Sequence, residues 1–326
     1  MKKDFCYLVT SLLLFLMPAF LFGQAPNLGA ASGFALFTKA GAFSNVGTSS
    51  LTGDIGSNSV TVTGFPPGIV VGTIHNPPDP TLAQAALDVV TAYSDLSAIA
   101  CGVTIGTTLG NNQVLVPGVY CQSAATILNG DLTLDGGGDP NALFIIKIGG
   151  ALITNANSRV ILTNSTSLCN VYWQITGQVD LAGSVFRGTI LSQGAINLSN
   201  GSSLEGRGLS TGGAITLNNN VVTIPQSVGT PAFALGATSN RCQEAGTVTY
   251  TATAINNNGI TYNLDATTAA FAGNSIVATT GIVTYAVGWS GTTIITASAA
   301  GCDGPKTAIH TVTVYPSSLT SAITHQ

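Results

Sequence analysis

Four copies of one short phrase recur along the chain and constrain its fold more than any other feature. They are Gly130-Asp-Leu-Thr-Leu, Gly177-Gln-Val-Asp-Leu, Gly194-Ala-Ile-Asn-Leu and Gly213-Ala-Ile-Thr-Leu, with Gly150-Ala-Leu-Ile-Thr as a looser fifth. Successive glycines are 20, 27, 17 and 19 residues apart, and the longest step contains a polar insert at 163–170. A repeat of about 20 residues with alternating apolar positions is typical of a β-solenoid, whose rungs stack about 4.8 Å apart. We therefore expect flat surfaces on which equivalent residues form straight files.

The first 23 residues have the pattern of a secretory signal peptide. Lys2 and Lys3 precede an apolar run from Tyr7 to Phe22, and small residues follow it. We expect residues 1–23 to be removed and the mature chain to be secreted, to the extracellular space or the outer cell surface. An uncleaved membrane anchor is the alternative, although the run is short for a membrane-spanning helix.

The chain carries few charges. Charged residues make up 7% of it, where about 25% is typical of globular proteins. Without the first 23 residues, 7 basic and 12 acidic side chains remain, a net charge of −5. A nucleic-acid groove needs clustered Lys and Arg, which the sequence lacks, so we exclude nucleic acid as a partner. The surface must instead consist of Thr, Ser, Asn, Ala and Gly.

Five cysteines remain in the exported chain, and export permits disulfide bonds. We expect one bridge between Cys101 and Cys121, at the start of the rungs, and another between Cys242 and Cys302, around a later domain. Cys169 is then left as a buried, inert thiol, because no His or basic residue neighbours it in the sequence.

The dipeptide Asp79-Pro80 predicts the start of a helix, with Asp as the N-cap and Pro at the first helical position. Apolar residues follow at helical spacing to about residue 100 and define one apolar face: Leu82, Ala86, Val89, Tyr93, Leu96 and Ala100. A helix of this length spans roughly 31 Å, and six stacked rungs span roughly 29 Å. We expect the helix, at about 79–100, to lie along the solenoid and cover one side.

Alternation within the phrases assigns their residues to the inside or the outside of the coil. The expected inward pairs are Val179 and Leu181, Ile196 and Leu198, and Ile215 and Leu217. A second alignment places Phe186 and Leu204 inside, with Arg187 and Glu205 outside as a cross-strand ion pair. We expect this ion pair to be structural.

The rung pattern stops near residue 225, so we assign residues 24–225 to the solenoid and 226–231 to a linker. Residues 232–316 contain short alternating strands separated by turns such as Asn256-Asn-Asn-Gly259. This rhythm predicts a β-sandwich, which resembles the Ig-like modules of bacterial surface proteins and adhesins. Residues 317–326 form a tail.

Four landmarks resemble the microbial ice-binding protein family over about residues 27–225. They are Leu28-Gly-Ala-Ala-Ser-Gly-Phe-Ala-Leu-Phe, Leu51-Thr-Gly-Asp-Ile-Gly-Ser-Asn, Cys169-Asn-Val-Tyr-Trp-Gln and Phe186-Arg-Gly-Thr-Ile-Leu. The resemblance implies a mainly β fold, a right-handed, discontinuous, triangular solenoid with a long helix alongside. It also implies a non-enzymatic protein that binds ice, inhibits ice growth and suppresses recrystallisation, without any cofactor.

The family often carries Thr, then Ala or Gly, any residue, then Thr or Asn on its ice-contacting face. Here Gly194-Ala-Ile-Asn197 and Gly213-Ala-Ile-Thr216 match the last three positions, with glycine in place of the leading threonine. Carried across the rungs, the expected ice-binding file is Thr133, Ile153, Asp180, Asn197 and Thr216, flanked by Ala151, Gln178, Ala195 and Ala214. Asp180 is the one charged member, and a charged group holds its own hydration shell.

Two other functions compete with ice binding. Parallel β-helices also host polysaccharide-degrading enzymes, but these need clustered carboxylates, and Asp135-Gly-Gly-Gly-Asp139 is more typical of a turn than of a calcium loop. The histidines at 75, 310 and 325 lack metal-ligand spacing. A non-ice adhesin or carbohydrate-binding module is the stronger alternative, although aromatic candidates are limited to Tyr172 and Trp173. We expect a monomer whose partners are ice and, through the C-terminal domain, the cell envelope.

Overall fold

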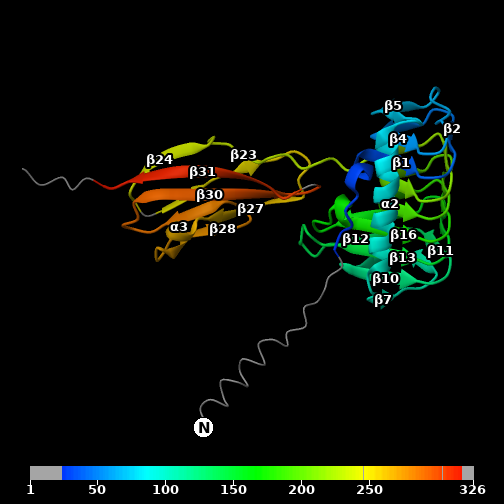
Figure 1. Ribbon diagram of the computed structural model, residues 1–326. Coiled ribbons are helices and arrows are strands. Elements are labelled where there is room, and N and C mark those ends of the chain that lie inside the picture. Colours follow the sequence, from blue (N-terminus) through cyan, green and yellow to red (C-terminus); the bar gives the residue numbers. More distant parts are fainter. Residues whose placement is uncertain (1–23, 245, 303, 318–326) are drawn as a thin grey trace, which may run out of the picture.

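A computed structural model describes residues 24–317, apart from residues 245 and 303. The expected signal peptide and the tail from residue 318 onward lie outside the described residues. Figure 1 shows a tall stack of strands with a helix along one side, and a separate elongated domain beside the stack. The protein is mainly β, as the sequence predicts. Within the described part of the chain, no helix is both long enough and apolar enough to cross a membrane.

The stack is a coil with three sides. One side is a seven-stranded parallel sheet, here called the flat sheet. Its strands, in spatial order, are β2 (Phe43–Val46), β21 (Ile215–Asn218), β19 (Ile196–Leu198), β17 (Val179–Leu181), β14 (Leu152–Thr154), β11 (Thr126–Asn129) and β8 (Thr108–Gly110).

A fifteen-stranded parallel sheet forms the other two sides, here called the helix side and the third side. Two long strands belong to both sides: β18 (Val185–Ser192) and β20 (Ser203–Ser210). The helix side also contains β6 (Ile74–His75), β4 (Asp54–Ser57), β1 (Phe34–Thr38), β16 (Val171–Ile175), β13 (Phe144–Ile148), β10 (Gly118–Gln122) and β7 (Val103–Thr104). The third side also contains β5 (Ile69–Val71), β3 (Ser50–Thr52), β22 (Val221–Thr223), β15 (Arg159–Thr163), β12 (Asp131–Asp135) and β9 (Gln113–Leu115).

The order of the rungs is discontinuous. The first coil stacks on the last rung, because β1 pairs with β20, β2 with β21 and β3 with β22. Helix α2 (Pro80–Ala98) then runs along the stack to its opposite end (Figure 1). The remaining rungs follow in sequence from that end back towards the first coil. A short 3-10 helix, η1 (Gly29–Gly33), packs against α2.

Helix α2 covers the helix side, as its apolar face predicts. Its buried residues are Leu82, Ala85, Ala86, Val89, Ala92, Tyr93 and Leu96. They pack on the strands through Ile145, Tyr172, Leu191 and Leu209. Ala100, expected on this face, is exposed beyond the end of the helix. At that end, Lys147 Nζ donates to the carbonyl oxygens of Ser97 and Ile99, at 2.9 and 2.7 Å, where a cation complements the helix dipole.

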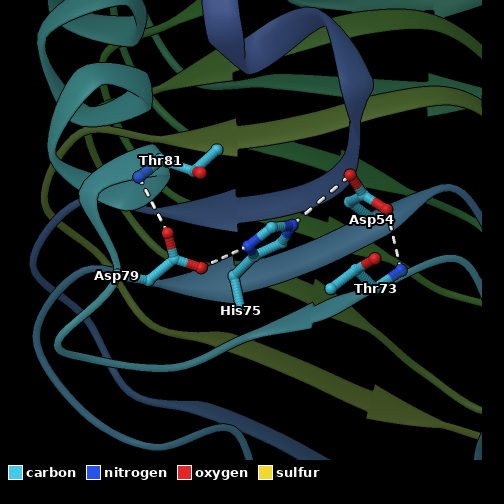
Figure 2. Close-up of polar contacts among 5 residues, drawn as sticks. All are labelled: Asp54, Thr73, His75, Asp79 and Thr81. Carbon is cyan, nitrogen blue, oxygen red and sulfur yellow. Dashed lines mark hydrogen bonds and ion pairs between the residues drawn. The ribbon is translucent and has the colours of Figure 1, made fainter.

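Polar contacts hold the start of α2 against the first coil (Figure 2). The Asp79 carboxylate caps the helix by accepting from the Thr81 amide at 2.8 Å, and its other oxygen lies 2.6 Å from His75 Nδ1. His75 Nε2 lies 3.4 Å from an Asp54 oxygen, and Asp54 also accepts from the Thr73 amide at 2.7 Å. The hydrogen bond with His75 is the largest influence that lowers the pKa of Asp79 below its ordinary value of 3.8.

A file of glycines explains why the phrase begins as it does. Gly41, Gly150, Gly177, Gly194 and Gly213 stack at the corner between the helix side and the flat sheet. A Cβ on Gly194 would lie 2.6 Å from the Gln178 backbone nitrogen, and one on Gly177 would lie 2.7 Å from that of Ala151. Such contacts are too close for any side chain, so glycine is required at these positions of the corner.

Hydroxyl groups complete the same corner. Ser57, Thr38, Ser210 and Ser192 each donate to the carbonyl oxygen of a corner glycine, at 2.7–2.9 Å. These bonds give the corner carbonyls a hydrogen-bond partner, and an unpaired buried carbonyl would cost free energy. The corner is therefore fixed by close backbone contact and by hydrogen bonds together.

The interior of the coil is apolar, and the inward residues expected from the alternation are all buried. Trp173 is fully buried, packs on Phe186 and donates from its indole nitrogen to the Arg187 carbonyl at 2.9 Å. Phe186 pairs in register with Leu204. Arg187 binds Glu205 on the outside through two hydrogen bonds, at 2.8 and 3.0 Å, so the expected cross-strand ion pair is confirmed.

The C-terminal domain has two main sheets packed over one apolar core. One contains β24 (Thr238–Cys242), β31 (Lys306–Tyr315), β30 (Gly291–Ala300) and β27 (Gly259–Leu264). The other contains β25 (Gly246–Thr249), β29 (Ile282–Tyr285) and β28 (Ser275–Val277). A two-stranded sheet, β23 (Ala232–Phe233) and β26 (Ala252–Thr253), and the helix α3 (Ala266–Ala270) complete the domain.

The two disulfides differ in how they match expectation. Cys101 is joined to Cys121, as predicted. The predicted Cys242–Cys302 bridge is wrong: Cys302 is joined to Cys169, and Cys242 is a free, exposed thiol. The reason is the length of β31, which separates them. Cys242 pairs with Tyr315 at the end of that ten-residue strand, about 30 Å from the turn that holds Cys302.

The Cys169–Cys302 bridge fastens the C-terminal domain to the solenoid. Cys169 lies in the 3-10 turn η2 (Leu168–Asn170), between β15 of the third side and β16 of the helix side. That corner of the triangle is opposite the flat sheet, and Figure 1 shows the C-terminal domain on the side away from β2 and β11. The linker meets the same junction, since the Val228 amide donates to the Cys302 carbonyl at 2.8 Å.

The corner predicts a large effect from one methyl group. Gly194→Ala should lower the free energy of unfolding in urea by about 1–3 kcal/mol, because the methyl group must displace backbone of the adjacent rung. Gly118→Ala is the matched control, since its Cβ would meet the Tyr120 ring at an ordinary 3.7 Å, and its stability should barely change. Equal stability of the two variants would contradict the role given to the corner.

The start of α2 predicts a pH dependence. Because the pKa of Asp79 is lowered in the folded state, its charged form stabilises the fold at pH values above its ordinary pKa of 3.8. This contribution is lost as pH falls through the lowered value. Asp79→Asn keeps a helix N-cap, so the difference in melting temperature from the parent protein should shrink as pH falls from about 5 to below about 4. A difference that grows on acidification would contradict this assignment.

The interdomain bridge predicts a change of shape. The double variant Cys169→Ser/Cys302→Ser leaves the linker as the one covalent connection between the domains, so its radius of gyration in small-angle X-ray scattering should rise. Cys242→Ser is the control, because it removes a thiol that bonds to no other cysteine. Superimposable scattering curves for the double variant and the control would show that the bridge does not fix the arrangement.

Candidate functional site

The flat sheet presents one straight file of outward residues at its centre. On β17, β19 and β21 each of these side chains lies between two buried neighbours on its own strand and points away from the core. The pairing register aligns the file directly: Asp180 with Asn197, Asn197 with Thr216, and Thr216 with Ser44. In spatial order the central file is Thr63, Ser44, Thr216, Asn197, Asp180, Ile153, Ile127 and Thr108.

Two further files flank the central one. One flanking file lies on the side of the glycine corner, and backbone hydrogen bonds from its carbonyl oxygens to amides of the adjacent rung fix its alignment. Its members are Ala42, Ala214, Ala195, Gln178, Ala151 and Ala125. The file on the other side is Val46, Asn218, Ser199, Ala182, Asn155 and Asn129. Seven strands span roughly 29 Å across the sheet, and three alternate positions span roughly 13 Å along it. The surface is therefore broad, level and built from short side chains.

Polar side chains on this surface bond to each other within the sheet. Asp180 accepts from Gln178 Nε2 and from Asn197 Nδ2, both at 2.6 Å, and Thr216 Oγ1 donates to Asn197 Oδ1 at 2.8 Å. At the other end of the sheet, Asn155 donates to Asn129, which donates to Asn111, at 2.8 and 2.9 Å. These lateral bonds hold the side chains against rotation.

Two arginine–carboxylate ion pairs lie on the third side. Arg159 forms two hydrogen bonds to Asp131, at 2.8 and 2.6 Å, which are the main cause of the lowered pKa of that carboxyl. Asp135 accepts from Asn164 and from the Gly137 amide, which closes the expected turn. Asp180 is the single ionisable residue in the three files of the flat sheet. Among the described residues, no group of three or more His, Cys, Asp or Glu side chains is placed to hold a metal ion.

The structure brings together eight of the nine residues expected at the site. Ile153, Asp180, Asn197 and Thr216 lie in the central file, and Ala151, Gln178, Ala195 and Ala214 lie beside them. The placement of Thr133 in this file is wrong, because it lies in β12 on the third side, between Val114 and Ile161.

The phrase at Gly130 caused this error. Gly130 has a positive φ of 68° and starts the turn onto the third side, whereas the other glycines mark the corner before the flat sheet. In the central file, Ile127 occupies the position next to Ile153 that was expected for Thr133. The sequence does contain a signal for Ile127, because Ala125-Thr-Ile-Leu128 parallels Ala151-Leu-Ile-Thr154. Thr108 and Thr63 were also missed, because their segments lack the glycine phrase. Ser44 was missed although Gly41-Ala-Phe-Ser44 has the same pattern as Gly213-Ala-Ile-Thr216, with which it pairs.

The aromatic candidates for a sugar-binding face point elsewhere. Trp173 is inside the coil, and Tyr172 is buried beneath α2. The three files of the flat sheet contain no aromatic residue. Stacking on sugar rings, the usual basis of carbohydrate binding, therefore has no platform on this sheet.

Comparison with known proteins agrees with this geometry. A family model described as ice-binding-like matches residues 37–223. An ice-binding protein of Nostoc sp. (strain HG1) is 40% identical over 205 residues, which cover 62% of this chain and 72% of that protein. An ice-binding protein of Flavobacterium frigoris (strain PS1) is 31% identical over 215 residues, covering 61% of this chain and 76% of that protein.

Solved structures show the same similarity. A crystal structure of an ice-binding protein from an Antarctic bacterium of the Flavobacteriaceae has a TM-score of 0.61 at 43% identity; the match covers 67% of this chain and 54% of the other, so this chain spans about half of that protein. One from the Antarctic ascomycete Antarctomyces psychrotrophicus has a TM-score of 0.59 at 34% identity and covers 63% of this chain and all of the other. On these grounds, the chain belongs to the ice-binding-like family.

Proposed function

We propose that the protein binds ice through the flat sheet and thereby inhibits ice growth and recrystallisation. One observation carries the proposal: the outward side chains of seven rungs align into three files. These side chains are short, almost all uncharged, and none of them is aromatic. Family membership supports the same function, because the relatives described above are named ice-binding proteins.

The physical chemistry of an ice surface favours such a face. Ice offers neither charges nor a pocket, so a partner must be level, rigid and able to hold ordered water. Thr and Ile side chains have a branched Cβ that restricts χ1, and so they lose little rotamer freedom on contact. Alanines in the flanking file keep the surface flat. A charged side chain would cost several kcal/mol to dehydrate, and the two Arg–carboxylate pairs lie on the third side instead.

The alternative function, a non-ice adhesin or carbohydrate-binding module, has less support. Its aromatic candidates, Tyr172 and Trp173, are both buried. Enzymatic activity is likewise not favoured: the carboxylates on the third side pair with arginines or close a turn. We infer that the protein is not an enzyme and acts without a cofactor, as a monomer.

We further propose that the protein is secreted and that its C-terminal domain is a stem towards the cell envelope. Two disulfides are typical of an exported chain. The domain is fastened at the corner opposite the flat sheet, which leaves that sheet free to meet ice (Figure 1). An Ig-like identity of this domain, residues 232–316, and a right-handed solenoid over residues 24–225 are part of this proposal.

A bulky residue on the flat sheet tests the main proposal. Ala195→Tyr places a ring between Gln178 and Ala214, so the sheet can no longer approach ice closely. A loss of about 1.4 kcal/mol of binding free energy would weaken adsorption to ice about tenfold, so thermal hysteresis and inhibition of recrystallisation should both fall. The melting temperature should change little, because residue 195 points away from the core.

Thr133→Tyr is the control for this test. It adds a ring to the third side of the same solenoid, and its hysteresis should equal that of the parent protein. Full activity in Ala195→Tyr together with loss in Thr133→Tyr would assign ice binding to the third side. Absence of hysteresis and of crystal shaping in the parent protein would reject ice binding altogether.

A further inference from the structure

Asp180 has an unexpected environment for the one ionisable residue on an ice-binding surface. It lies on β17, in the middle of the central file, with Ile153 on one side and Asn197 on the other. Both carboxylate oxygens accept short hydrogen bonds, Oδ2 from Gln178 Nε2 and Oδ1 from Asn197 Nδ2. Hydrogen bonds to an ionised acceptor are roughly twice as strong as those between neutral groups.

The carboxylate determines how its neighbours are oriented. An ionised carboxylate only accepts hydrogen bonds, so each neighbouring amide must turn its NH2 group towards it. The Asn197 oxygen then faces the next rung, where it accepts from the Thr216 hydroxyl at 2.8 Å. The bonds therefore run in one direction, from Thr216 to Asn197 to Asp180, across three adjacent rungs. The Thr216 proton is used within the sheet, which leaves the lone pairs of its oxygen for ice water.

We propose that Asp180 is a positioning residue for ice binding: it fixes the side chains of Gln178, Asn197 and, through Asn197, Thr216 in the orientation that they present to ice. This inference rests on the proposed function and adds to it. Gln and Asn have rotamers to lose on contact with a solid, and a side chain that is already immobilised loses less. The charge itself is compensated by hydrogen bonds that lie in the plane of the sheet.

Replacing Asp180 by threonine tests whether the carboxylate promotes ice binding by positioning its neighbours or weakens it by adding a charge to a neutral face. If Asp180 merely interrupts a neutral face, Asp180→Thr should raise activity, because it removes a charge and adds a branched hydroxyl side chain. If Asp180 positions its neighbours, the same variant should weaken ice binding, by about fivefold for each side chain released. The control is Asp95→Thr, which makes the same substitution at an exposed carboxylate of helix α2, away from the flat sheet, and it should leave activity unchanged.

A double-mutant cycle with Asn197→Thr tests whether Asp180 acts through Asn197. Thermal hysteresis is measured for the parent, Asp180→Thr, Asn197→Thr and the double variant. The loss caused by Asp180→Thr should be much smaller in the Asn197→Thr background, because the amide that it orients is absent. A general loss of stability would lower activity equally in both backgrounds. An equal loss in both backgrounds, or a gain in Asp180→Thr, would overturn the proposal while leaving ice binding by the parent intact.

The side chains can also be observed without ice. In NMR relaxation measurements on the parent protein, the NH2 groups of Gln178 and Asn197 should have high order parameters, and Asp180→Thr should lower both. The Asn129 and Asn155 NH2 groups serve as internal controls, because they bond to each other and to Asn111 and should be unchanged. Unchanged order at Asn197 in the variant would overturn the positioning role even if the parent protein bound no ice.

Discussion

The structure depends on close backbone contact at one corner of the coil. At Gly177, Gly194 and Gly213, adjacent rungs approach so closely that a single Cβ would collide with the backbone of the next rung. Serine and threonine hydroxyls bond to the carbonyls at this corner, so its geometry is fixed in two ways. Because a slip of one residue would turn every inward side chain outwards, a fixed corner also fixes the register of the flat sheet.

The properties of the flat sheet follow from that register. Because equivalent positions align, the surface consists of parallel files of side chains. The residue types in these files determine what the surface can contact. The flanking file next to the glycine corner is mostly alanine, whose short side chain keeps the surface flat. The central file consists mainly of Thr, Ile and Asn. Ion pairs occur on the third side, where Arg159 and Arg187 bind carboxylates of neighbouring strands. The second domain is fastened at the corner opposite the flat sheet, through Cys169. Each side of one solenoid thus has a separate role.

Much of this could be predicted from the sequence, because local rules decide it. Asp79-Pro80 marks the start of α2, and alternation identifies the inward residues of the phrases. Thr133 shows where such rules stop. A triangular coil has several corners, and a glycine repeat does not say which corner a given glycine occupies; Gly130 occupies another one. The Cys169–Cys302 bridge depends on how two domains meet, which no local pattern encodes. The hydrogen bonds around Asp180 required the register of three strands to be known.

The most direct test of ice binding uses the free thiol of Cys242, which is exposed in the domain opposite the flat sheet. The protein is labelled there with a fluorescent maleimide, and a single ice crystal is grown slowly into the solution. The account predicts that the growing ice incorporates the labelled protein on defined crystal planes, which then fluoresce. Exclusion of the label from the ice, as for a labelled protein without affinity for ice, would contradict the claim that the flat sheet adsorbs to ice.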